Sequence, residues 1–131
     1  MKRALLLAAI VLLPVAVAVF LWSRPASNPS PEEGRAIAEA FLARIGAGDV
    51  REAWDSTTAE FKSAEGQATF QARVAANAWL AKPVAFSSVQ RVEVNGVERF
   101  EFSFTSTANG KFVRILLARD PRDWKVDRMT L

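Results

Sequence analysis

An alternating stretch over residues 92–104 constrains the fold of this chain most strongly. It contains two runs in which apolar and polar residues alternate, separated by an Asn-Gly pair at positions 95 and 96, which is the signature of a β-hairpin. Phe100, Phe102 and Phe104 share one face of the second strand, because successive side chains point to opposite faces of a sheet. Another layer must cover these phenylalanines, so the hairpin predicts a sheet packed against helices.

Four segments of the second half predict strands, over residues 84–94, 97–107, 111–119 and 124–131. The connections between them are short, so consecutive strands are expected to pair antiparallel and to form a four-stranded meander. Together with the helices expected before residue 83, this order of elements predicts an α+β domain.

The charges around the first turn favour an odd-numbered loop. A two-residue loop would set Glu93 opposite Glu98, and like charges directly opposite each other are destabilising. A three-residue loop instead sets Glu93 opposite Arg99. We therefore expect the three-residue loop, with Glu101 opposite Arg91 in an ordinary exposed ion pair.

At the second Asn-Gly pair, positions 109 and 110, a two-residue loop is expected. It sets Phe104 opposite Ile115 and Phe102 opposite Leu117, which extends the apolar face onto a third strand.

Two apolar side chains of the third strand, Phe112 and Leu116, are expected on the opposite face of the sheet. Isolated exposed apolar residues are normal and need no explanation. Two of them in line on one strand also fit a sheet-to-sheet homodimer, and both interpretations stay open.

Capping signals predict two or three helices ahead of the strands. Residues 30–33, Ser-Pro-Glu-Glu, combine an N-cap serine, a proline at the first helical position and a capping-box glutamate. An apolar stripe follows at Ile37, Phe41 and Ile45. Similar patterns predict a short helix around Trp54, one more helical turn near Phe61, and a longer helix over about residues 64–79.

Residues 4–22 form an uncharged, mainly apolar run, close to the ~20 residues with which a helix crosses a ~30 Å hydrocarbon core. Lys2 and Arg3 precede the run, so the positive-inside rule leaves the short N-terminal segment in the cytoplasm. A cleaved signal peptide is the alternative. The apolar run continues past the Ala-Val-Ala triplet at 16–18, which favours an uncleaved anchor.

The sequence thus divides into a cytoplasmic stub with its transmembrane anchor at 1–23, a Pro- and Ser-rich linker at 24–31, and a folded domain at 32–131. The expected protein is a single-pass inner (cytoplasmic) membrane protein. Its partner through residues 4–22 is the lipid bilayer, and its C-terminal domain is periplasmic or otherwise extracytoplasmic.

Composition removes several classes of function. The chain has no His, Cys or Tyr, so the usual nucleophile–base pairs and transition-metal ligand sets cannot be assembled, and no catalytic residue, cofactor or metal site is expected. Lys2 and Arg3 precede the apolar run. Without them, the 17 basic residues fall to 15 against 14 acidic ones, so nucleic acid is not an expected partner.

A ligand pocket between helices and sheet is the competing hypothesis. Arg73 and Asn77 lie one helical turn apart and are candidates for its polar lining. The candidate apolar lining is Trp54, Phe70, Phe100, Phe102 and Phe104. Aromatic residues at such spacings more often form plain core, and the sequence does not separate the two cases.

Several structural positions together carry a family resemblance. They are Phe41-Leu42 and Ile45 before Gly48-Asp49-Val50, then Ala53-Trp54 and Phe61-Lys62, and Trp124-Lys125-Val126 in the last strand. With helices followed by a meander, residues 32–131 resemble the nuclear transport factor two-like superfamily of cystatin-like α+β cones, and within it the small exported bacterial members of unknown function.

The resemblance implies a curved sheet with helices on its concave face, a conical pocket between them, and dimers formed through the exposed sheet face. Enzymes of the superfamily use Asp, Tyr or His in the cone, and no catalytic residue is transferred to this chain. The expected function is a membrane-anchored, extracytoplasmic, non-enzymatic domain for protein interaction or envelope assembly. A small-molecule-binding or, less favoured, enzymatic cone is the alternative.

Overall fold

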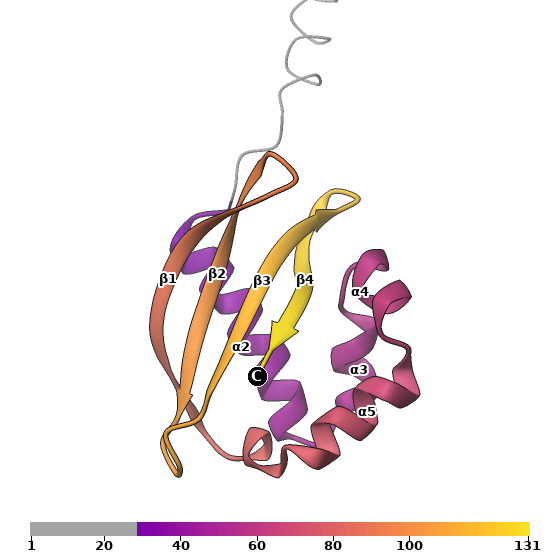
Figure 1. The fold of residues 1–131 in the computed structure, drawn as a ribbon, viewed down its shortest axis with the longest axis vertical. Coiled ribbons are helices and arrows are strands. Elements are labelled where there is room, and N and C mark those ends of the chain that lie inside the picture. Colours follow the sequence, from indigo (N-terminus) through magenta and orange to yellow (C-terminus); the bar gives the residue numbers. More distant parts are fainter. Residues whose placement is uncertain (1–28) are drawn as a thin grey trace, which may run out of the picture.

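The computed structural model describes residues 29–131, where four α-helices and one 3-10 helix precede four strands (Figure 1). The predicted anchor and residues 24–28 of the predicted linker lie outside the described residues. The elements are α2 (Pro31–Gly46), α3 (Val50–Asp55), α4 (Ala59–Ala64), α5 (Gln67–Ala76), η1 (Ala78–Ala81), β1 (Val84–Val94), β2 (Val97–Ser106), β3 (Phe112–Asp120) and β4 (Asp123–Thr130). The predicted α+β class is confirmed, with four α-helices instead of two or three.

The first helix begins where its capping signal predicts. Ser30 Oγ accepts from the backbone N–H of Glu33 at 3.2 Å, and the Glu33 carboxylate accepts from the N–H of Ser30 at 3.3 Å. This reciprocal pair satisfies two amide donors that the first helical turn cannot use.

The bounds of the long helix expected over about residues 64–79 are wrong, because the helix starts later and ends earlier than predicted. Gly66 has an extended backbone and caps α5, which ends at Ala76. Asn77 then donates from its side-chain amide to the carbonyl of Arg73 at 2.9 Å, and a 3-10 turn follows. Glycine weakens a helix from within, so the predicted helix divides there.

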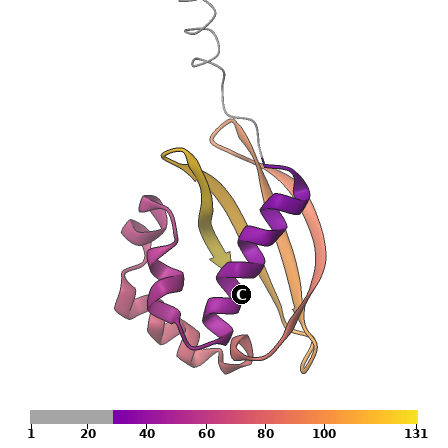
Figure 2. The same cartoon turned by 180° about the vertical axis from the view of Figure 1, so that it is seen from behind.

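The four strands pair antiparallel in the order β1-β2-β3-β4, as the meander prediction requires. Helix α2 crosses one face of this sheet diagonally, while α3, α4 and α5 lie beyond the β4 edge (Figure 2). Two β-bulges, one between Phe86 and Ser88 and one opposite the Leu116–Leu117 step, interrupt the ladders. Such bulges bend strands and increase their twist.

The expected three-residue loop at the first turn is wrong. Asn95 and Gly96 have φ angles of 53° and 76°, which a two-residue type I′ turn requires, and Glu93 lies opposite Glu98. Glu98 instead has a cation nearby, with its carboxylate 3.6 Å from Arg91. The repulsion is weak because both glutamates are exposed to water.

The bulge in β1 offsets the change in strand register that the two-residue turn introduces. It changes the pairing by one residue, so Phe86 still lies opposite Phe104. Nearer the turn, Arg91 lies opposite Phe100 and places its guanidinium 5.8 Å from the centre of that ring. The cation and its aliphatic stem thus cover this end of the apolar face.

The second turn, in contrast to the first, is longer than expected. Ser106 N–H donates to Lys111 O at 2.7 Å, which leaves a four-residue loop over residues 107–110. Phe104 therefore lies opposite Val113, and Phe102 lies opposite Ile115. The pairing is displaced by two residues, so every side chain keeps its predicted face even though its partner changes.

The core is closed between α2 and the phenylalanine face of β2. Phe100, Phe102 and Phe104 are all buried in it. Helix α2 approaches so closely that a Cβ atom at Gly34 would lie 2.6 Å from Cζ of Phe102. Within residues 29–131, no helix is long and apolar enough to cross a membrane.

Candidate functional site

The predicted apolar lining of the cone is mostly packed core. Phe70 is fully buried and meets the ring of Phe61 edge-on at 5.5 Å, with Phe41 at 6.1 Å. Phe100 and Phe102 pack on each other at 6.2 Å under α2. These rings fill the space that the predicted pocket would occupy beneath Phe70, Phe100 and Phe102.

Two further predicted lining residues, Trp54 and Asn77, hold the helices together. The indole N–H of Trp54 donates to the carbonyl of Glu65 at 2.9 Å, which ties α3 to the link between α4 and α5. The side chain of Asn77 turns back onto its own helix and accepts weakly from the indole of Trp79 at 3.4 Å. Neither residue lines a groove of the described domain.

A groove does open beside β4, and Arg73 is the predicted residue that lines it. It encloses about 440 Å³ between α4, α5 and β4, within the size range of small-molecule sites. Its lining residues are Glu60, Phe61, Ala64, Glu65, Thr69, Arg73, Asp127, Arg128 and Met129. We call it the β4 groove.

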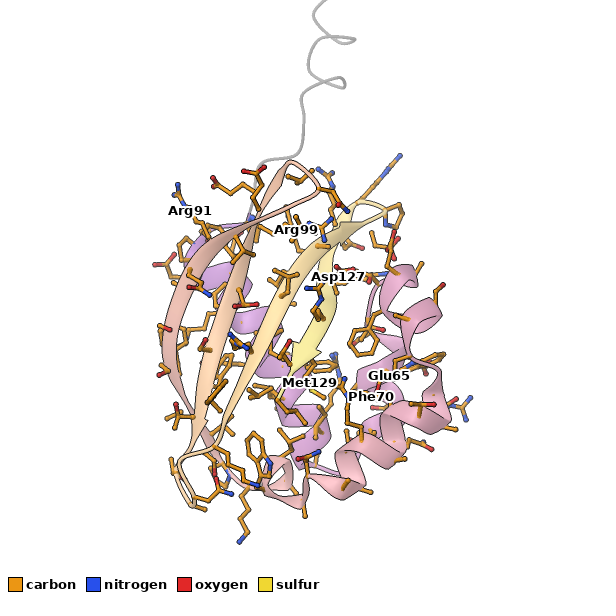
Figure 3. All side chains as sticks on the ribbon, in the orientation of Figure 1. Glu65, Phe70, Arg91, Arg99, Asp127 and Met129 are labelled. Carbon is orange, nitrogen blue, oxygen red and sulfur yellow. The ribbon has the colours of Figure 1, made fainter. Side chains whose placement is uncertain are left out.

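Arg73 lines the β4 groove and contacts three residues that Figure 3 labels, Glu65, Phe70 and Met129. Its two terminal nitrogens donate to Glu65 Oε1 at 2.6 Å and to the carbonyl of Met129 at 2.8 Å. The guanidinium also lies 6.0 Å from the centre of the Phe70 ring. Its Nε is buried and finds no acceptor among the described residues. The arginine thus joins α5 to the free edge of β4, with one donor unsatisfied.

The second charged wall is centred on Asp127, a carboxylate only 11% exposed. One of its oxygens accepts from Arg99 at 2.9 Å, and the other accepts from the hydroxyl of Thr58 at 2.7 Å. The same hydroxyl accepts from the N–H of Phe61 and so caps α4. Asp127 occupies the bulge of β4, and the extra residue lets it leave the strand alternation and reach both partners.

The β4 groove continues into a hollow of about 290 Å³ beside Arg99, since both are lined by Glu60, Asp127 and Arg128. The floor of the β4 groove is apolar and is formed by Phe61 and Met129. The walls of the groove carry the two ion pairs described above. Such a surface suits a ligand with an apolar body and a few polar groups.

The sequence pointed to Arg73 but not to Glu65 or Asp127. Both acids act through tertiary partners, 8 residues away for Glu65 and 28 and 69 residues away for Asp127. All three separations exceed the three or four residues over which side chains meet on a single helix. The one available signal was that Asp127 is acidic in a segment predicted as a strand, where aspartate is depleted.

A second, more apolar groove of about 330 Å³ lies between the end of α2, η1 and the start of β1. Phe104 is the predicted residue that contributes to it, and Leu42, Leu80 and Val84 also line it. Charged side chains enter only at Glu39 and Lys82.

The predicted ion pair between Glu101 and an arginine does not form. Glu101 accepts instead from the side-chain amide of Gln90 at 2.9 Å, because the two-residue turn sets these residues opposite each other. Arg91 pairs with Glu98, and Arg99 pairs with Asp127. The error in turn length therefore changes the partners in both charge pairs predicted for the first hairpin.

The two residues of the predicted outer-face interface differ in their exposure to solvent. Phe112 is 51% exposed as predicted, with the guanidinium of Arg114 lying 5.5 Å from its ring centre. Leu116 is only 1% exposed, so its prediction as an exposed contact is wrong. It lies between Glu101 and Arg128 on the neighbouring strands, and the stems of such long side chains cover apolar surface.

Replacing Phe112 by serine is expected to change the free energy of unfolding of the monomer by less than about 0.5 kcal/mol, since an exposed side chain contributes little. Leu116→Val should cost roughly 1 kcal/mol, because it removes one buried methylene. Urea denaturation of both variants checks the pair. An equal loss in the two would contradict the assignment of Phe112 to the free surface.

Comparisons with protein-family models, with curated proteins and with solved structures find no match to this chain.

Proposed function

We propose that this protein is a membrane-anchored domain that acts outside the cytoplasm by binding, in protein interaction or envelope assembly, and not by catalysis. One observation carries the proposal: the apolar run at residues 4–22 is succeeded within a few residues by a folded domain that begins at Pro29. An apolar run of this length fits a bilayer, and Lys2 and Arg3 ahead of it favour export of the domain on its C-terminal side.

The non-enzymatic part of the proposal rests on chemistry that the sequence lacks and on the state of the charged groups. His, Cys and Tyr do not occur in the chain. The two most buried carboxylates of ion pairs in residues 29–131, Glu65 and Asp127, are both engaged by arginines. Engaged groups of this kind more often stabilise a fold than transfer protons.

The proposed fold family is the nuclear transport factor two-like superfamily. Support comes from the order of helices before a four-stranded antiparallel meander and from the placement of α2 across one sheet face (Figure 2). A homodimer through the outer sheet face is part of the same proposal. Phe112 is its remaining apolar contact, so Phe112→Ser should abolish dimers in sedimentation velocity without loss of fold.

Membrane extraction tests the anchor. The full chain expressed in a bacterial host should stay in the membrane pellet after a carbonate wash. Substituting Val11 and Leu13 by arginine should release it, because each arginine at the centre of a span costs about 2.5 to 3.5 kcal/mol. The matched control places the two arginines at Ser87 and Asn109, both exposed in the domain. Release of the unaltered chain by the wash would refute the anchor.

Small-molecule binding in the β4 groove is the second candidate function, and the groove with Arg73 in its wall is the observation that favours it. A library of small amphipathic acids and amines, screened by thermal denaturation, should then contain compounds that raise Tm. Thr69→Trp should abolish the effect by filling the groove. Ala72→Trp is the control, since Ala72 is exposed on the same helix and does not line the groove.

A further inference from the structure

The start of α2 limits how far the domain can stand from a membrane. Pro29 is buried against the domain, so only the six residues 23–28 separate it from the end of the apolar run at Trp22. A chain of six residues spans at most about 20 Å when fully extended. The folded domain therefore begins close to the end of the apolar run.

One end of the domain is nearer to this attachment than the other. Helix α2 begins near the end of the sheet that carries the β1–β2 and β3–β4 turns, and it runs away from that end (Figures 1 and 2). Gly34 packs on Phe102, five residues along β2 from Val97. These positions put Pro29 roughly 10 Å short of the β1–β2 turn, from the rises of a helix and a strand.

The linker can then extend only about 10 Å beyond the turn, while each headgroup layer of a bilayer is about 5 to 8 Å thick. We propose that the end of the domain formed by the β1–β2 and β3–β4 turns, residues 93–98 and 119–123, rests on the phospholipid headgroups of the bilayer that anchors the chain. This inference rests on the anchor in the proposed function. We call these residues the turn end.

The turn end carries Glu93, Glu98, Asp120 and Asp123 against Arg119 and Arg122, so its placement at the headgroups follows from the short linker and not from its net charge. Val97 is 53% exposed, the largest exposed fraction among the exposed large apolar residues of the described domain. Arg119 and Arg122 are exposed at the β3–β4 turn, and neither pairs with a carboxylate within residues 29–131. Arginine binds phosphate groups through paired N–H donors, and a single apolar side chain can enter the interfacial layer at little cost.

The opposite end of the sheet is a built-in control. Strand β2 carries Val97 at one end, while the loop over residues 107–110 and Lys111 follow its other end. The two ends are about 30 Å apart along the strand. Headgroups that reach Val97 are therefore out of reach of Lys111.

The test uses the full chain in phosphatidylcholine–phosphatidylglycerol vesicles that contain a headgroup spin-labelled lipid. The described domain has no cysteine, and neither has the rest of the sequence, so Val97→Cys and Lys111→Cys each give one site for a bimane fluorophore. Both positions are exposed, and either change should leave the fold intact. Bimane at position 97 should be quenched at least about threefold more than at position 111, because of the separation along the strand.

The outcomes separate this inference from the anchor beneath it. Vesicles that float without the protein refute the anchor, and the inference falls with it. If the protein floats but positions 97 and 111 are quenched equally, the anchor stands and the orientation is wrong. If bimane at position 97 is unquenched and the unlabelled Val97→Cys variant forms disulfide-linked dimers, the turn end contacts a second copy of the chain, which also overturns the proposal.

Discussion

Replacing Phe102 by alanine should lower the free energy of unfolding by about 3 to 5 kcal/mol, the usual cost of removing a fully buried aromatic ring. The ring is 0% exposed and lies in the middle of the face on which α2 packs. Urea denaturation of residues 29–131, which contain the whole described core, measures the loss. Phe112→Ala is the matched control, because it removes the same ring from an exposed position.

The reverse change on the helix tests the same contact. Alanine normally stabilises a helix relative to glycine, yet Gly34→Ala should destabilise this domain by about 1 to 3 kcal/mol because its Cβ would lie 2.6 Å from Phe102 Cζ. In the double variant the new methyl group partly fills the cavity left by Phe102→Ala. The two costs should therefore sum to clearly more than the measured double-variant loss. Additive losses would mean that α2 does not press on Phe102.

The second large effect is expected at Asp127. Alanine there should cost about 2 to 3 kcal/mol, since the partly buried guanidinium of Arg99 and the buried hydroxyl of Thr58 lose their partner together. The same change loosens α4 from the β4 edge. Hydrogen exchange should show it as faster exchange of the Phe61 amide, which donates to Thr58 Oγ1.

Two further variants identify the cause of that loss. Asp123→Ala removes an exposed aspartate from the start of the same strand and should change stability by less than about 0.5 kcal/mol. Asp127→Ala combined with Arg99→Leu should recover part of the loss, because the guanidinium is no longer left without a partner. No recovery would show that the Arg99–Asp127 ion pair is not what holds this region together.

The sequence was sufficient for features that depend on neighbouring residues. The capping box at Ser30 and Glu33 fixes the start of α2, and the alternation of Phe100, Phe102 and Phe104 fixes which face of β2 is buried. Both are decided within a few residues, where local hydrogen bonds and side-chain periodicity dominate.

Pairing between strands was not predictable in the same way. The charges of Glu93 and Glu98 favoured the wrong loop, because an exposed repulsion is smaller than the preference of Asn-Gly for a type I′ turn. The bulge near Ser87 then places Phe86 opposite Phe104. A bulge changes the pairing by one residue and leaves no periodic mark in the sequence.

The candidate site could be predicted only in part. Arg73 was identified as a candidate polar lining residue one helical turn from Asn77, and it does line the β4 groove. Its partners Glu65 and Met129 come from another helix end and from the last strand. Their approach depends on where α5 begins and on the bulge at Asp127, and neither was expected from the sequence.

The central claim is that the chain keeps its N-terminal apolar run and is anchored in the membrane by it. Intact-mass measurement of the protein extracted from membranes tests this most directly. The account predicts a mass that includes residues 1–22. A chain that begins near Val19, recovered free of the membrane, would contradict it, because signal-peptide cleavage would then have removed the anchor.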